Sequence, residues 1–118
     1  PNFCDLSMES SDPYQRDRDQ WPQFRTKGAD FMLGKCEGFI KYVSERGVQP
    51  VLCFYIHPWE FEEMPRGAID YGEASVKPLD FITLNCGEVA CQEMDKLLGG
   101  MMAMGGEVKT AAQVAAEY

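Results

Sequence analysis

The single histidine of the chain, His57, is the side chain best suited to proton transfer near neutral pH. It stands in the stretch "VLCFYIHPWEFEEMP", directly after six apolar residues and directly before Pro58, Trp59 and Glu60. An imidazole can donate or accept a proton, and the flat apolar face of a tryptophan can pack against the C–H surface of a sugar. The position alone leaves two readings open, namely an acid–base site and a core histidine satisfied by a backbone carbonyl.

Two predicted elements position His57. Residues 28–46 carry apolar side chains at helical spacing and Gly47 follows, which predicts a helix with a glycine just past its end. Residues 50–56, "PVLCFYI", are apolar on both alternating faces, as in a strand buried on both sides of a parallel sheet. We therefore expect an α/β fold. Its sites lie at the carboxyl ends of the strands, and Pro58 holds His57 in an extended backbone that aims the imidazole into a cleft. The apolar positions of the predicted helix are Met32, Cys36, Phe39, Ile40 and Val43.

The segments on either side of this unit are less regular. Residues 1–27 include "ESSDPYQRDRDQWPQF", with two prolines and alternating charges, and predict an irregular excursion. Residues 58–77 contain several glycines and prolines and predict a long loop. Residues 78–85, "PLDFITLN", predict a strand or an extended entry to the next helix.

A second long helix is predicted from about residue 86. Asn85 and Glu88 have the spacing of an N-cap and its reciprocal partner, and Gly105 and Gly106 end the helix. "EVK" is short enough for a last strand, and "TAAQVAAEY" opens with Thr110 and Gln113 at capping-box spacing. One side of the long helix carries Val89, Ala90, Met94, Leu97, Leu98 and Met101.

Three other groups of residues could do chemistry, and each also has a plainer explanation. Four methionines could form a face that binds a soft metal ion or varied partners, but their helical spacing favours a role in the core. They are Met94, Met101, Met102 and Met104. Glu60, Glu62 and Glu63 could hold a hard cation, but a solvated acidic loop is the favoured explanation, because nothing in the sequence fixes their geometry. The five cysteines lack a CxxC pair, and Cys36 and Cys53 stand among apolar residues, which favours buried free thiols in a reducing compartment such as the cytoplasm.

Length and charge limit the classes of protein. The 118 residues suffice for one domain, and 45% hydrophobic residues fit a globular chain. The net charge of −8 and the lack of a Lys/Arg cluster argue against binding to nucleic acid or to an anionic membrane. The first ten residues, "PNFCDLSMES", do not resemble a signal peptide, and no apolar run is long enough for a membrane span.

The octapeptide "FYIHPWEF", residues 54–61, resembles the last signature motif of the polysaccharide deacetylase family, which has a NodB-homology domain. The resemblance is to the branch in which a hydrophobic strand is followed by His-Pro-Trp-Glu. "CEGFIKYVSERG", "CQEMDKLLGGMMAMGG" and "EVKTAAQVAAEY" resemble the helix before that strand, the long helix after it and the closing segment of the domain. The likeness covers most of residues 28–118. It implies that residues 1–118 are the C-terminal portion of one distorted (β/α) TIM-like barrel.

The resemblance also implies a reaction. Members of the family remove N-acetyl groups from carbohydrates with a divalent, zinc-type metal ion and an aspartate general base. His57 matches the histidine that acts as general acid and protonates the departing amine. Pro58, Trp59 and Glu60 would line the sugar site. The family motif that tunes the acid histidine ends in an Asp-Trp pair, for which Asp19 and Trp21 in "RDRDQW" are the nearest counterparts, in a different arrangement.

Other family motifs are absent from the sequence. The paired aspartates after Thr-Phe do not occur, and a chain with one histidine cannot supply the two metal-binding histidines. No metal ligand is therefore assigned. The resemblance implies a C-terminal half whose metal and base lie on missing strands, and such a half barrel would expose sheet edges. We expect it to be unstable alone or to belong to a larger assembly.

Two alternatives remain at this point. The chain could be a non-catalytic remnant of the fold that binds a glycan or a protein partner through its acidic, tryptophan-bearing rim. It could also come from a related amidohydrolase acting on a small cyclic or linear nitrogen compound, because specificity would lie in loops that the sequence does not define.

Overall fold

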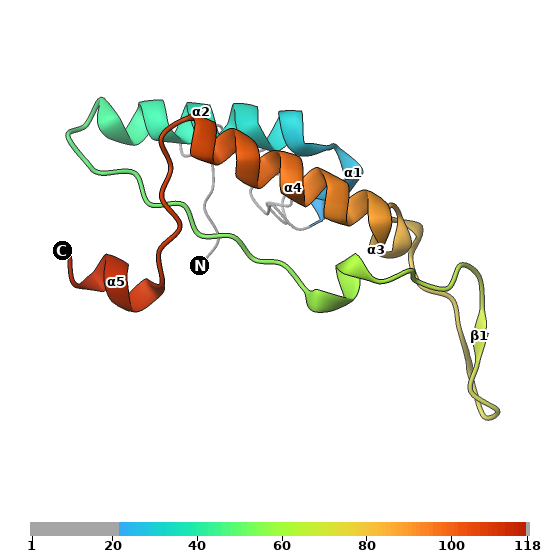
Figure 1. The fold of residues 1–118 in the computed structure, drawn as a ribbon. Helices are drawn as coiled ribbons and strands as arrows, with labels where there is room; N and C mark the ends of the chain where they lie inside the picture. The colour runs from blue at the N-terminus through green and yellow to red at the C-terminus, as the bar shows by residue number, and fades with distance from the viewer. Residues whose placement is uncertain (1–21, 118) are drawn as a thin grey trace.

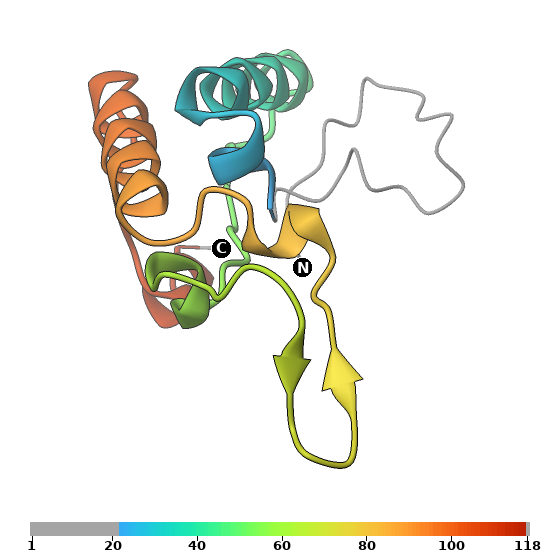
Figure 2. The same ribbon diagram turned by 90° about the vertical axis from the view of Figure 1, so that its right-hand side faces the viewer.

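Two long helices dominate the fold of residues 22–117, the part of the chain that the computed structural model describes. Helix α2 packs along α4, and the short helix α1 packs against both of them (Figures 1 and 2). The elements in chain order are α1 (Gln23–Thr26), α2 (Ala29–Ser44), the 3-10 helix η2 (Pro58–Phe61), β1 (Ile69–Asp70), β2 (Ser75–Val76), α3 (Asp80–Thr83), α4 (Glu88–Ala103) and α5 (Ala111–Ala115).

The core lies where these three helices meet. Helix α2 buries Met32 and Cys36, α4 buries Ala90 and Leu97, and α1 adds Phe24. Each fully buried large apolar side chain contributes about 1.5–3 kcal/mol relative to exposure. The helical spacing in the sequence correctly predicted α2 and its buried Met32, Cys36 and Val43.

At two helix ends, the end of α2 and the start of α5, the sequence signals predicted the observed structure. Gly47 has φ 69°, the left-handed conformation expected just past the end of α2. At α5 the Oγ1 of Thr110 accepts from the backbone N–H of Gln113, and the Gln113 side chain accepts from the backbone N–H of Thr110 at 2.8 Å. The capping box predicted for these two residues is therefore confirmed.

The start of α4 differs from the prediction. Asn85 was expected to cap this helix, but the N-cap is Gly87, and the Asn85 side chain instead donates to the backbone carbonyl of Arg25 at 2.8 Å. Asn85 has φ 56°, so the chain turns sharply there before the helix begins. Met102 and Met104, expected in the core, are exposed, as are Val89 and Leu98, whereas Met94 and Met101 pack against the core.

Two predicted strands are absent from the described part of the chain. Residues 51–57 run as a stretched segment beneath α2 and α4 without joining a sheet (Figure 1). Residues 80–83, inside the predicted strand 78–85, form the helical turn α3. A strand is stable only when its backbone pairs with a neighbour, and among residues 22–117 only β1 and β2 pair with each other.

Three smaller differences concern segments predicted as loop, strand or excursion. The predicted loop 58–77 contains η2 and an antiparallel hairpin in which Ile69 faces Val76; this hairpin projects from the helices in Figure 2. The "EVK" segment is coil. The end of the predicted excursion 1–27 forms α1, whose Gln23, Phe24 and Arg25 are buried, and its earlier residues lie outside the described part.

Gly87 allows the close approach between η2 and α4. It has φ 77°, and a Cβ at this position would lie 3.1 Å from Cγ of Glu63 and 3.3 Å from the Glu63 backbone nitrogen. We expect Gly87→Ala to lower the free energy of unfolding by about 1–2 kcal/mol, the cost of left-handed backbone for a residue with a Cβ. Gly99→Ala is the matched control, because Gly99 lies inside α4 with open space around it, and this change should stabilise by about 0.5–1 kcal/mol. Urea unfolding that ranks the two variants in the opposite order would contradict this account of Gly87.

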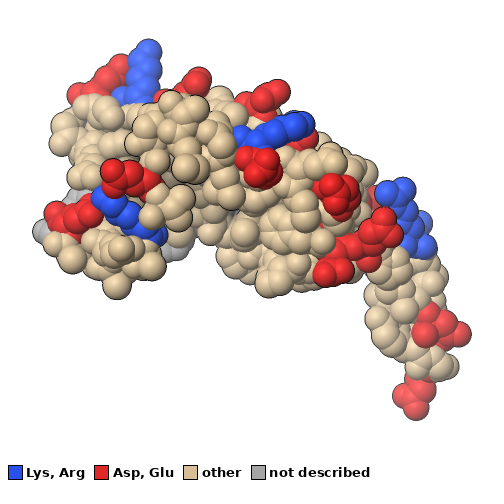
Figure 3. All heavy atoms as spheres, viewed as in Figure 1, with Lys and Arg blue, Asp and Glu red and all other residues tan. Residues whose placement is uncertain are grey.

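The surface is acidic and mixed in sign. On the face drawn in Figure 3, basic side chains lie beside acidic ones. Lys109, for example, has carboxylate oxygens of Glu107 and Glu117 at 3.0 Å and 2.8 Å, and these contacts raise the pKa of Lys109. None of the described helices is both long and apolar enough to cross a membrane.

Candidate functional site

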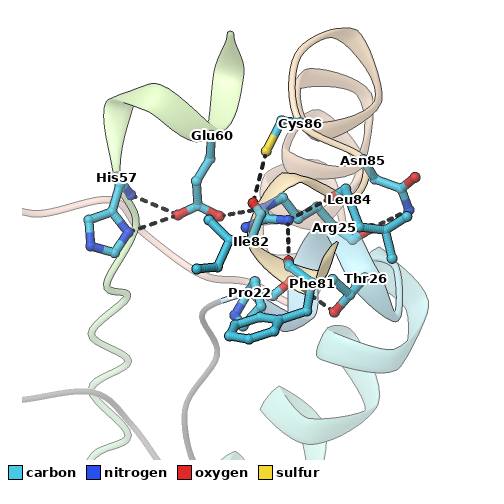
Figure 4. Close-up of polar contacts among 10 residues, drawn as sticks. All are labelled: Pro22, Arg25, Thr26, His57, Glu60, Phe81, Ile82, Leu84, Asn85 and Cys86. Atoms are coloured by element: carbon cyan, nitrogen blue, oxygen red, sulfur yellow. Dashed lines mark hydrogen bonds and ion pairs between the residues drawn. The ribbon is translucent and has the colours of Figure 1, made fainter. Parts of the chain in front are cut away.

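His57 has the extended backbone that the sequence predicts, at the end of the extended segment 51–57. His57 has φ −116° and ψ 139°, the extended conformation that a following proline enforces. Pro58 then begins η2, and this single tight turn brings the side chain of Glu60 back beside Nδ1 of the imidazole. The Oε1 atom of Glu60 accepts from the backbone N–H of His57 at 2.9 Å and lies 3.2 Å from Nδ1 of the imidazole (Figure 4).

Glu60 is fully buried and forms an ion pair with Arg25 of α1. The Nε atom of Arg25 donates to Oε2 of Glu60 at 2.7 Å, and both side chains have 0% exposure. Glu60 was expected to line a sugar site, but its two carboxylate oxygens face inward, one toward Arg25 and one toward His57. The physical reason is the cost of a buried charge, which is tolerated only when a partner of opposite charge and several hydrogen bonds accompany it.

Arg25 connects three parts of the fold. Its Nη1 donates to the backbone carbonyls of Phe81, at 3.1 Å, and of Leu84. Its own backbone carbonyl accepts from the Asn85 side chain. Figure 4 shows these contacts converging from α1, η2 and the α3–α4 connection, so the orientation of Glu60 depends on all three.

The outer edge of the imidazole faces a cluster of aromatic groups. Nε2 of His57 lies 2.8 Å from the hydroxyl of Tyr55, and the Trp59 ring stacks on the imidazole with a centroid separation of 5.3 Å. The guanidinium of Arg25 lies 5.6 Å from the Trp59 centroid. The His57 side chain as a whole is 25% exposed.

The other residues singled out in the sequence lie as follows. Pro58, Glu62 and Glu63 are exposed, and Trp59 is half-buried against His57. Asp19 and Trp21 lie outside the described residues. Sequence reasoning missed Arg25 altogether. The sequence offers only an arginine directly after "PQF", and α1 is too short to show periodicity.

The cysteines divide by exposure. Cys36 is buried, and this burial raises the pKa of its thiol to about 11. Cys86 is half-buried and its pKa is also raised, because desolvation outweighs the opposing charge of Arg25. Cys53 was expected to be buried but is exposed, because the segment that carries it joins no sheet.

We expect iodoacetamide to modify the described cysteines in the order that exposure and thiolate content set. Cys53 and Cys91, both exposed, should react first. Cys36 should react only after unfolding, because at pH 8 a thiol of pKa about 11 is ionised to the order of one part in a thousand. Peptide mapping by mass spectrometry at timed intervals measures the order. Labelling of Cys36 as fast as Cys91 in the folded chain would contradict the packing of α2.

The described residues do not fit a metal ion. Among residues 22–117 no group of three or more His, Cys, Asp or Glu side chains could hold one, and the buried carboxylate of Glu60 is already paired with Arg25. A cavity of about 260 Å³ lies away from His57 at the base of the hairpin, lined by Pro65, Arg66, Gly67, Pro78, Asp80, Thr83 and Leu84. Comparisons of the chain with protein-family models, with curated proteins and with solved structures found no match.

Proposed function

We propose that the chain is the C-terminal portion of a polysaccharide deacetylase-type (β/α) barrel that removes N-acetyl groups from a carbohydrate, with His57 as the general acid. One observation carries the proposal. A buried carboxylate contacts Nδ1 of His57, whose side chain is 25% exposed, at the end of an extended apolar segment. This is the arrangement that an imidazole needs in order to exchange a proton at one defined nitrogen.

The proposed step is proton transfer to the leaving group. Water adds to the acetyl carbonyl, the C–N bond of the tetrahedral intermediate breaks, and Nε2–H of protonated His57 passes its proton to the departing amine nitrogen. The products are acetate and the free amino sugar. Because residues 22–117 offer no metal site, the proposal places the metal ion and the general base in other parts of the domain.

The stretched segment supports the barrel part of the proposal. Residues 51–57 have the composition of a buried strand, yet Val51, Tyr55 and Ile56 are 38–49% exposed. Apolar side chains on both faces of an extended backbone fit a strand whose neighbours belong to another part of the domain. In the proposal, such neighbours would pair with this segment and leave His57 at its carboxyl end.

The test is an acetate-release assay on the complete polypeptide that contains these residues. It is incubated with N-acetylglucosamine oligomers and, separately, with small linear and cyclic amides. We expect release of acetate from the oligomers. Hydrolysis of the small amides alone would instead favour the related amidohydrolases, and activity on neither substrate would contradict the proposal.

A second candidate function is a non-catalytic module that binds a protein partner. The exposed apolar side chains along residues 48–56 favour it, because a contiguous apolar surface commonly marks an interaction site. Size-exclusion chromatography with light scattering on the complete polypeptide separates the two candidates. A stable complex with a protein partner, formed by a polypeptide that shows no hydrolytic activity, would support the binding module.

A further inference from the structure

We propose that Glu60 and Arg25 are positioning residues that set which nitrogen of His57 carries the proton. The inference rests on the proposed function only for the identity of the group that receives the proton at Nε2. The arrangement of hydrogen bonds itself comes from the contacts of the described residues and can be tested on the chain without a substrate.

Glu60 makes the contact at Nδ1 of the imidazole. Its Oε1 atom lies 3.2 Å from Nδ1 and also accepts from the backbone N–H of His57. An ionised carboxylate can only accept hydrogen bonds, so this contact favours the neutral imidazole that has its proton on Nδ1 and a lone pair on Nε2. The Tyr55 hydroxyl, 2.8 Å from Nε2, then donates to that lone pair.

Arg25 holds the other oxygen of the Glu60 carboxylate. A guanidinium has donors and no acceptor, so it requires an oxygen at the Oε2 position of Glu60. Because Arg25 is itself held by hydrogen bonds to the carbonyls of Phe81 and Leu84, the Glu60 carboxylate cannot rotate freely. Its Oε1 atom therefore stays beside Nδ1. Arg25 thus acts on His57 through Glu60, without contacting the proton that is exchanged.

This arrangement confines proton exchange to one nitrogen of the imidazole. With Nδ1–H committed to a buried acceptor, protonation and deprotonation occur at Nε2, the nitrogen on the exposed edge. The Tyr55 hydroxyl occupies the position of an incoming group in the absence of substrate, and Tyr55 is 49% exposed, so it can move aside.

The experiment is a long-range ¹H–¹⁵N spectrum of the uniformly labelled chain, at a pH where the ring is neutral. His57 is the only histidine, so the two imidazole nitrogens are assigned without ambiguity. We expect the wild type to show a protonated Nδ1 and an unprotonated Nε2. A wild type with the proton on Nε2 overturns the inference, whatever the variants do.

Two variants test the roles of the pair. In Glu60→Gln the single amide oxygen cannot accept from both Arg25 and the His57 backbone N–H. The charged guanidinium is the stronger donor and takes the oxygen, so the NH₂ group faces Nδ1 and we expect the proton to move to Nε2. In Arg25→Met/Glu60→Gln that constraint is removed, and the amide can turn its oxygen to Nδ1 and restore the wild-type tautomer. A purely structural pair would not produce this reversal, and a folded Glu60→Gln variant with unchanged imidazole shifts contradicts the inference.

Glu62→Gln is the control, because Glu62 is an exposed neighbour on the same turn. The His57 imidazole spectrum of this variant should match that of the wild type. If Glu60→Gln does not fold, the wild type and the double variant still decide the question. The result is independent of catalysis, since a chain without deacetylase activity can still show the protonated Nδ1. Failure of the proposed function is therefore distinguishable from failure of this inference.

Discussion

Replacing Arg25 with methionine is expected to lower the free energy of unfolding by about 3–5 kcal/mol, the usual cost of removing one partner of a buried ion pair. The change leaves the Glu60 carboxylate at 0% exposure without the charge of Arg25, and removes the hydrogen bonds that Arg25 donates to the carbonyls of Phe81 and Leu84. Urea unfolding followed by circular dichroism measures the effect. In a chain of marginal stability, a loss of this size removes the cooperative transition altogether.

Arg46→Met is the matched control for this prediction. Arg46 is exposed near the end of α2, where its guanidinium lies over the Tyr42 ring, and a surface substitution of this kind changes stability by about 0.5 kcal/mol or less. Arg25→Met/Glu60→Leu should recover much of the lost stability, because replacing both members of a buried pair by apolar groups is often close to neutral. Equal effects of Arg25→Met and Arg46→Met would show that the buried pair does not join α1 to η2.

Replacing His57 with glutamine in the complete polypeptide is expected to reduce kcat for deacetylation by about 10²–10⁴-fold, the usual contribution of a general acid. Glutamine keeps hydrogen-bonding capacity at this position but cannot deliver a proton to the amine. KM should change little, because the proposed role of His57 is in the bond-breaking step. Initial rates of acetate release over a range of oligomer concentrations give both constants.

The control for this prediction is Glu62→Gln, which alters the charge on the same turn without touching His57. Its kcat should stay near that of the wild type. A His57→Gln variant that deacetylates at close to the wild-type rate would remove the general-acid assignment, whereas the buried Arg25–Glu60 pair would be unaffected by that result.

The elements that sequence predicted correctly are those set by local signals. The apolar spacing of Met32, Cys36 and Val43 identified α2, Gly47 marked its end, and Thr110 with Gln113 marked the start of α5. Each of these signals acts over a few residues within one helix, and no distant partner is needed to satisfy it.

The strands were predicted from their amino-acid composition, which does not show whether a second strand is available to pair with them. Residues 51–57 have the apolar side chains of a buried strand. A strand also needs a neighbouring backbone to pair with, and no described segment pairs with residues 51–57. Residues 78–85 contain the same kinds of side chain, and four of them close into the helical turn α3 instead. Strand assignment therefore failed where pairing is non-local.

The site was predicted in part for the same reason. The extended backbone at His57 follows from Pro58 next along the chain, and it is confirmed. The burial of Glu60 depends on Arg25, which is 35 positions away, and no periodicity in the sequence links the two residues. Sequence reasoning without that contact assigned Glu60 to the sugar site, whereas the structure places its carboxylate in a buried ion pair with Arg25.

The proposal that residues 51–56 form an inner strand of a larger barrel, with His57 at its carboxyl end, can be tested by hydrogen exchange. Amide exchange of these residues is followed by mass spectrometry in the complete polypeptide and in the 118-residue chain under identical conditions. The account predicts strong protection of these amides in the complete polypeptide and markedly less in the 118-residue chain. Equally fast exchange in both would contradict it.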